Sequence, residues 1–391
     1  MTESLSLVNA RKLLLDHQRL NSRRHFGSGI KATLNAIEHL GYVQLDTLSV
    51  VERAHLHTLW NRVDGFKPDH IDKLQRSGKI FEHWAHALAL LPMRDYRFSL
   101  PMMHRIAAGE THWYPKNKKV CKYVLDRIRN EGALAAKDFD DKPTSKAMWA
   151  RAPSMHALEQ LFIEGELMIA YRNNFHKVYD LTERVLPDSA ETKVPTEEEL
   201  CRHLISSFIR AHGFGQLNEM SYLRKGLGPA MRKTALEMIE EGSLCEVKVN
   251  KLDYLTAPAS LARSNQQCPR SSFRILSPFD NAIIQRKRIN DLFGFDYQIE
   301  CYVKKEKRKF GYFCLPLLHK NKLVGRLDAK TVRKTRTLQL LHLQLEKGIR
   351  NPASVMQSMK SELKRFMQFN NCTKLEIRKV TGSKENPDFQ L

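Results

Sequence analysis

Hydrophobic positions recur along the first two thirds of the chain in a repeated order of helices and strands. Between residues 119 and 187, apolar side chains at helical spacing predict one helix that ends at Gly132 and another that begins at Pro153. Two apolar stretches, Leu167–Tyr171 and Val178–Leu181, flank a polar turn and predict a β-hairpin. A helical pair followed by a two-stranded wing is typical of a winged-helix unit.

The same order occurs twice more. Between residues 196 and 259, two helical stripes, the second ending before Gly242, precede two short strand-like stretches. The N-terminal region is less regular, with one helix predicted from leucines between Leu7 and Leu20 and another over Ile30–Leu40. Gly41 follows that second helix as its expected C-cap. The pattern therefore predicts three units of one kind.

After Ser271 the pattern changes to strands separated by charged turns. A helix with one apolar face is predicted to start at Pro352. Closely spaced strands of this kind indicate a small barrel or sandwich. The predicted strands are Tyr297–Val303, Phe310–Leu318, Leu323–Leu327 and Leu338–Leu343.

The expected fold is α+β, with three tandem winged-helix domains followed by a C-terminal β-barrel-like domain. We expect the domains to span residues 1–118, 119–192, 193–262 and 263–391. Units in tandem need no second chain to complete them, so we expect a monomer. The 42% of hydrophobic residues among 391 suffices for ordinary cores and excludes a wholly disordered chain.

Composition narrows the cellular setting. No apolar run approaches the roughly 20 residues of a membrane span, so no membrane partner is expected. The N-terminus has no basic stretch before its apolar residues, which argues against a signal peptide. The seven cysteines include no C-x-x-C pair, so neither a disulfide framework nor a zinc site is indicated. We expect a cytoplasmic protein, nucleoid-associated if bacterial.

Positive charge points to a polyanionic partner. The formal net charge is +21, and residues 270–336 hold 17 Lys and Arg against 6 Asp and Glu. Cations at the predicted strand turns of one β domain favour a nucleic acid partner over a merely solvated surface, and RNA stays open. The DNA-binding candidates from these clusters are Lys304, Lys305, Lys307, Arg308, Lys330 and Arg333.

The segment from Gly41 to Thr47 carries the strongest chemical signal. If it is extended, Val43 and Leu45 face one side while Gln44 and Asp46 share the other. A carboxylate and a carboxamide two residues apart can hold one water, with Asp46 accepting its proton. The structural alternative is that Asp46 caps a following helix, which the spacing alone favours.

Several stretches, in order, resemble one family of enzymes. Gln44-Leu45-Asp46 looks like the Q-Φ-D signature of the AlkZ/YcaQ family (AlkX type) of winged-helix glycosylases that unhook DNA interstrand crosslinks. The similarity extends from about Leu5 to Leu343. The other matching stretches are Ser49–Arg53, Phe81–His86, Gly165–Met168, Val178–Leu181, Leu276–Asn281, Leu292–Tyr297 and Leu323–Lys330.

This resemblance implies a function. Members hydrolyse the N-glycosidic bond of N7-alkylated purines in duplex DNA, including crosslinked ones, with no metal or cofactor. By this resemblance, Gln44 and Asp46 would be the catalytic pair that positions and activates the attacking water. No lysine lies beside the motif as a Schiff-base nucleophile, so we expect a monofunctional glycosylase without lyase activity.

Three further residues are DNA-binding candidates. Arg53 is expected to contact a phosphate, and His83 and His86 either reach DNA beside Asp46 or are interior histidines. The competing hypothesis is a non-catalytic winged-helix DNA-binding regulator, which the composition fits equally well. The carboxylate of Asp46 distinguishes the two hypotheses. Near phosphates it weakens DNA binding by like-charge repulsion, so a protein that only binds DNA has no use for it there.

Overall fold

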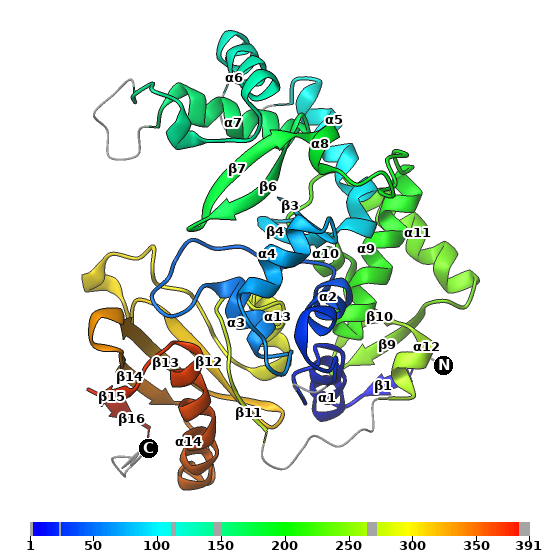
Figure 1. The fold of residues 1–391 in the computed structure, drawn as a ribbon. Helices are drawn as coiled ribbons and strands as arrows, with labels where there is room; N and C mark the ends of the chain where they lie inside the picture. Colours follow the sequence, from blue (N-terminus) through cyan, green and yellow to red (C-terminus); the bar gives the residue numbers. More distant parts are fainter. Residues whose placement is uncertain (1–2, 23–24, 111–114, 144–150, 264–271, 383–391) are drawn as a thin grey trace.

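The computed structural model describes residues 3–22, 25–110, 115–143, 151–263 and 272–382. Three small units, each with helices around a short sheet, precede a larger C-terminal sheet that carries one long helix. Figure 1 shows the second unit at one end of the molecule and the large sheet at the other, with the first unit between them. The first unit therefore lies where the surrounding units meet.

The first unit packs its helices against a three-stranded sheet of order β2–β4–β3. Gly41 ends the second helix in the left-handed conformation, at φ 79°, and so turns the chain directly into β2. The elements are α2 (Gly29–Leu40), β2 (Val43–Gln44), α3 (Ala54–Trp60), α4 (Asp69–Arg76), β3 (Ile80–Trp84), β4 (Leu88–Pro92), η1 (Met93–Ser99) and α5 (Leu100–Ala107).

The second unit confirms the predicted helices and hairpin. Its first helix ends at Gly132 and its second is capped by Gly165 in the left-handed conformation. Asn174 and Phe175, both with positive φ, form the tip of the hairpin. The elements are α6 (Lys118–Glu131), β5 (Leu134–Ala135), η2 (Ala136–Asp138), α7 (Pro153–Glu164), β6 (Leu167–Asn173), β7 (His176–Leu181) and α8 (Thr182–Val185).

The third unit has the predicted helices and wing, and it also incorporates the start of the chain. Strand β1 (Glu3–Leu5) pairs in parallel with β9, and α1 (Leu7–His17) shares an apolar core with the wing. The remaining elements are α9 (Glu197–His212), β8 (Phe214–Gly215), α10 (Leu217–Met220), α11 (Gly228–Glu240), β9 (Cys245–Val249), β10 (Leu252–Thr256) and α12 (Pro258–Leu261).

The C-terminal sheet runs in the order β11–β12–β13–β14–β15, with β16 also paired to β14, and forms a half-barrel. Apolar residues of α14 and the sheet belong to one core. The elements are β11 (Phe273–Ile275), α13 (Arg286–Phe293), η3 (Lys305–Lys307), β12 (Cys314–His319), β13 (Lys322–Val332), η4 (Arg333–Thr335), β14 (Thr337–Leu345), α14 (Pro352–Phe369), β15 (Lys374–Ile377) and β16 (Val380–Thr381).

The predicted strand Tyr297–Val303 is wrong, because this segment forms an irregular loop before β12. Its buried Glu300 carboxylate accepts hydrogen bonds from the backbone N–H groups of Lys309, Phe310 and Gly311. The loop is thus closed by a side chain instead of a strand partner, which a strand-like pattern of apolar residues does not reveal. The cations from Lys304 to Lys309 consequently lie on a loop with one short helical turn, and not on a hairpin tip.

The first unit and the C-terminal sheet share one hydrophobic core. Arg62, fully buried in the first unit, forms a two-pronged ion pair with Asp280 at 2.7 and 2.8 Å. The backbone N–H of Thr331 in β13 donates to the carbonyl of Val50 at 2.9 Å. Because buried ion pairs require both partners, this junction holds the segment between β2 and α3 in a defined place.

The α+β class is confirmed. The number of winged-helix domains and the boundaries at 118, 192 and 262 stay predictions. The described cysteines are free thiols, while Cys268 lies outside the described residues. In the part of the chain that the structure describes, no helix has the length and apolar character needed to cross a membrane.

Candidate active site

Strand β2 ends with Gln44, and Asp46 lies two residues further along the chain. Val43 pairs with Leu90 of β4, and both Val43 and Leu45 belong to the hydrophobic core. Since side chains alternate along an extended backbone, Gln44 and Asp46 share the other face. The core positions of Val43 and Leu45 agree with the predicted alternation, although the regular strand ends at Gln44.

Gln44 is held by His86, which lies in the turn between β3 and β4. The side-chain oxygen Oε1 of Gln44 and Nε2 of His86 are 3.1 Å apart, and Gln44 is only 8% exposed. Burial and then the charge of Arg224 lower the pKa of His86 to about 4, so the ring is neutral at physiological pH. Because a carbonyl oxygen only accepts, His86 donates from Nε2 and fixes the orientation of the carboxamide.

Asp46 closes a local turn and does not cap a helix. Its Oδ1 accepts a hydrogen bond from the backbone N–H of Leu48 at 2.7 Å, whereas the next helix begins only at Ala54. Partial burial raises the pKa of Asp46, and the Leu48 N–H opposes this shift. A carboxylate with a raised pKa and incomplete hydrogen bonding is a better proton acceptor than an ordinary aspartate.

The loop that precedes β12 lies close to Asp46. Partial burial and then the charge of Asp46 raise the pKa of Cys301, and the carboxylate of Asp46 also acts on the neighbouring Tyr302. Tyr302 is 78% exposed. The cations that follow, Lys304, Lys305 and Lys307, are exposed and Arg308 is partly so, which places a basic loop beside the carboxylate.

The second predicted basic cluster borders the same segment at Ser49. Arg333 is exposed and donates from Nη2 to the backbone carbonyl of Ser49 at 3.0 Å. Lys330 is exposed near the end of β13. The structure therefore brings both basic clusters close to the segment that carries Asp46, one beside Asp46 itself and the other beside Ser49.

Arg53 stacks on the tip of the β6–β7 hairpin. Its guanidinium lies 3.9 Å from the ring centroid of Phe175, and the guanidinium of Arg172 lies 4.3 Å from the same ring. Arg172 also donates two 2.6 Å hydrogen bonds to the carboxylate of Glu82 in β3. These stacked cations connect the hairpin of the second unit to the start of α3.

His83 and His86 have different surroundings despite their proximity in sequence. His83 lies within β3, is 1% exposed and packs against Phe162 of α7, with ring centroids 5.4 Å apart. His86 lies in the turn and contacts Gln44. The structure thus joins His86 to the catalytic candidates and places His83 in the interior of the protein.

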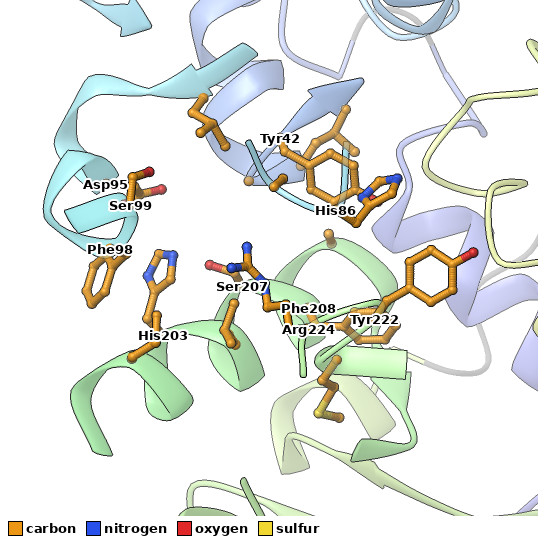
Figure 2. Close-up of a pocket in the computed structure, with 18 of the residues that line it drawn as sticks. Tyr42, His86, Asp95, Phe98, Ser99, His203, Ser207, Phe208, Tyr222 and Arg224 are labelled. Carbon is orange, nitrogen blue, oxygen red and sulfur yellow. The ribbon is translucent and has the colours of Figure 1, made fainter. Parts of the chain in front are cut away.

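Two residues beside His86 were missed by the sequence analysis. The rings of Tyr42 and Tyr222 both meet His86 edge to face, at centroid distances of 5.1 and 5.4 Å (Figure 2). Tyr42 is within the motif segment and could have been found there. Tyr222 and the neighbouring Arg224 follow α10, and no local pattern connects them to Gln44. Within the described ranges, no group of three His, Cys, Asp or Glu side chains could hold a metal ion.

Comparison with known proteins agrees with this arrangement. A family model described as "DNA glycosylase AlkZ-like" matches residues 37–369. The solved structure of Streptomyces sahachiroi DNA glycosylase AlkZ is similar to this one, with a TM-score of 0.67 and 14% sequence identity. The match covers 96% of this chain and 100% of the Streptomyces protein. Because the family model spans most of the sequence, this chain belongs to the AlkZ-like family of DNA glycosylases, enzymes of DNA repair.

Proposed function

We propose that this enzyme hydrolyses the N-glycosidic bond of N7-alkylated purines in duplex DNA, including purines in interstrand crosslinks. The observation that carries the proposal is the shared face of Gln44 and Asp46, with Gln44 anchored by a neutral histidine and Asp46 next to a basic loop. Family membership supports catalysis over the alternative of a non-catalytic regulator.

In the proposed reaction, Asp46 takes a proton from a water whose oxygen attacks the anomeric carbon C1′. The C1′–N9 bond breaks, and its electron pair neutralises the positive charge that alkylation placed on the purine. A cationic base is already a good leaving group, so no acid need protonate it. The carboxylate also stabilises the positive charge that develops on the sugar.

Gln44 orients the water in this mechanism. With Oε1 turned to His86, the amide group is directed by a hydrogen bond instead of rotating. The basic clusters would hold phosphates near the lesion. Lys304, Lys305, Lys307 and Arg308 belong to the loop beside Asp46, and Lys330, Arg333 and Arg53 lie beside the segment that follows Asp46.

The proposal is tested by incubating the protein with duplex DNA containing N7-methylguanine, followed by alkaline cleavage. We expect wild type to leave abasic sites and Asp46→Asn to lose about 10²- to 10⁴-fold in rate, because a general base is removed. Asp188→Asn removes the same charge at an exposed site in the linker before α9 and should behave as wild type.

Two readouts separate the outcomes. Near wild-type excision by Asp46→Asn would show that another group activates the water. Strand cleavage without alkali, or a covalent adduct trapped by borohydride, would contradict a monofunctional mechanism. The same assay on a nitrogen-mustard crosslink tests whether tethered purines are substrates.

A further inference from the structure

The β6–β7 hairpin of the second unit reaches the first unit with its tip (Figure 1). Phe175 at this tip has a φ of 71°, in the left-handed region that large side chains rarely adopt. Such a conformation costs free energy, persists only where the surrounding structure holds it, and is concentrated at functional sites. The mechanism proposed above gives this residue no role.

The tip is tied to a buried carboxylate of the first unit. Nη1 of Arg172 donates to the backbone carbonyl of Phe175 at 2.7 Å, and Nε and Nη2 of the same guanidinium donate to Glu82 in β3. The side chain of Glu82 is 1% exposed. Since this carboxylate is buried and both of its oxygens are bonded, it fixes Arg172, and Arg172 in turn fixes the backbone at Phe175.

The ring of Phe175 lies against two groups at the start of α3. The guanidinium of Arg53 is 3.9 Å from the ring centroid, and the ring of His55 is stacked at an angle of 13° with the centroids 5.7 Å apart. His55 is buried and neutral, because burial and then the charges of Arg172 and Arg53 lower its pKa to about 3. The buried partner ring keeps Phe175 in one place, so the surface on which Arg53 rests is fixed as well.

Arg53 has hydrogen-bonding groups that no described residue uses. Its Nε is buried without an acceptor, and within the described ranges no side chain or carbonyl accepts a hydrogen bond from the guanidinium. Burial lowers the pKa of Arg53, the charge of Glu52 opposes this shift, and the charges of Arg333 and Arg172 add to it. A guanidinium that is held in place but lacks an acceptor is suited to a phosphate, whose oxygens match its planar fork of donors.

The backbone between Asp46 and Arg53 is held by the C-terminal part of the chain. Strand β13 donates to the carbonyl of Val50 at 2.9 Å, and the side chain of Asn370 accepts from the backbone N–H of Glu52 at 2.8 Å. Asp46 and Arg53 therefore keep one position relative to each other. A phosphate bound at Arg53 would consequently lie at a fixed distance from the proposed water site.

We propose that Phe175 is a positioning residue of the DNA interface, whose ring holds the Arg53 guanidinium in place to bind one backbone phosphate near the lesion. This inference rests on the proposed function and adds a role for the second unit. The tip of the β6–β7 hairpin then orients a side chain of the first unit and does not itself read a groove of the DNA. Because Arg53 is ordered before DNA arrives, binding costs little further loss of its rotamer freedom.

The test uses the full chain and measures single-turnover excision of N7-methylguanine at varied enzyme concentration, together with a salt titration of DNA binding. Phe175→Leu removes the ring, so the half-saturating concentration should rise about 3- to 10-fold while the maximal rate is unchanged. The slope of log affinity against log salt should fall by about 0.9, the value for one phosphate contact. Phe175→Tyr keeps the ring and should restore the wild-type values.

A double variant distinguishes positioning from direct contact. If Phe175 acts through Arg53, then Phe175→Leu should cause little further loss of affinity in the background of Arg53→Met. Equal losses in both backgrounds would overturn the proposal, because the ring would then contact DNA itself. His176→Ala changes the exposed neighbour of Phe175 and should bind as wild type.

Thermal melting shows whether Phe175→Leu disturbs the fold. If this variant lowers Tm by more than a few degrees, Arg53→Lys replaces it, because lysine keeps the charge but lacks the planar group that stacks on the ring. Arg53→Lys should then raise the half-saturating concentration with the maximal rate unchanged. Wild-type affinity in Arg53→Lys would overturn the proposal, since positive charge alone would suffice.

Failure of this inference differs from failure of the proposed function. Normal excision by wild type, with unchanged affinity and salt slope in Phe175→Leu, would overturn the positioning role alone. Absence of excision by wild type, with the expected loss of DNA affinity in Phe175→Leu, would contradict the proposed activity and support the role of the hairpin.

Discussion

The two ends of the Gln44–Asp46 pair have contrasting surroundings. Asp46 adjoins exposed groups, namely Tyr302 and the basic loop. Gln44 adjoins His86, whose ring lines an enclosed cavity of about 110 Å³ together with Tyr42, Tyr222 and Arg224. Positive charge is thus present on both sides, but only the exposed cations exchange freely with salt. The contrast indicates that the exposed side suits contact with the DNA backbone, while the enclosed side holds Gln44 in one orientation.

The largest effect that would test this contrast concerns the basic loop. Replacing Lys304, Lys305, Lys307 and Arg308 with Gln should weaken DNA binding about 100-fold at low salt. It should also reduce the slope of log affinity against log salt by about 0.9 per lost phosphate contact. The measurement is a salt titration of binding to undamaged duplex.

A matched variant controls for the loss of four charges. Lys118, Lys119, Lys122 and Lys137 are exposed in the second unit, and their replacement with Gln should change the slope far less. Equal slopes for the two variants would mean that the salt dependence of DNA binding reflects the total charge of the protein and not the position of the basic loop. An unchanged slope in the loop variant would remove this loop from the DNA interface.

A smaller effect is expected on the enclosed side. His86→Phe keeps a ring but removes the donor to Gln44, so kcat should fall about tenfold while KM is nearly unchanged. Combined with Gln44→Ala, it should add little further loss, because both variants remove the same interaction. If the losses of the two single variants add in the double variant in single-turnover assays, then His86 and Gln44 act independently. His104→Phe, exposed on α5, is the control.

The smallest effects concern pH. Because burial raises the pKa of Asp46, excision should increase with pH around a midpoint above the usual value of about 3.9. His86, with a pKa of about 4, should give no inflection near pH 6.5. A midpoint near 6.5 that disappears in His86→Phe would instead mean that the imidazole titrates in this range.

The raised pKa of Asp46 also makes the stability of the fold depend on pH. A raised folded-state pKa means that Asp46 favours folding at low pH and that this contribution is lost as pH rises through its pKa. Asp46→Asn should therefore melt at the same temperature as wild type or up to about 2 °C higher at pH 7. The difference should vanish in acid. A clear decrease in Tm at pH 7 would mean that the carboxylate is structural.

Much of this arrangement could be predicted from local sequence. Gly41, Gly132 and Gly165 mark helix ends, and the alternation around Gln44 identifies the polar face of β2. These features depend on neighbouring residues, so they are visible without the fold. The sequence indicated His83 and His86 equally as neighbours of the catalytic pair. In the structure His86 contacts Gln44 because it lies in the β3–β4 turn, whereas His83 is buried within β3.

Other features depend on residues far apart in the chain. The segment Tyr297–Val303 has a strand-like composition, but Tyr297 is buried and donates to the carbonyl of Cys314, while Glu300 closes the loop. Arg224 reaches the cavity beside His86 only through the packing of the third unit against the first. No periodicity in a single sequence encodes such encounters, because they arise from tertiary packing.

The pairing of β1 with β9 affects how the chain folds during its synthesis. The first strand, Glu3–Leu5, aligns with Val247–Val249, so the ribosome must add more than two hundred residues before a partner exists. At about 5 to 20 residues per second this takes on the order of 10 to 50 s. During that time Leu13 and Leu14 of α1, buried in the finished protein, lack their core and are available to chaperones.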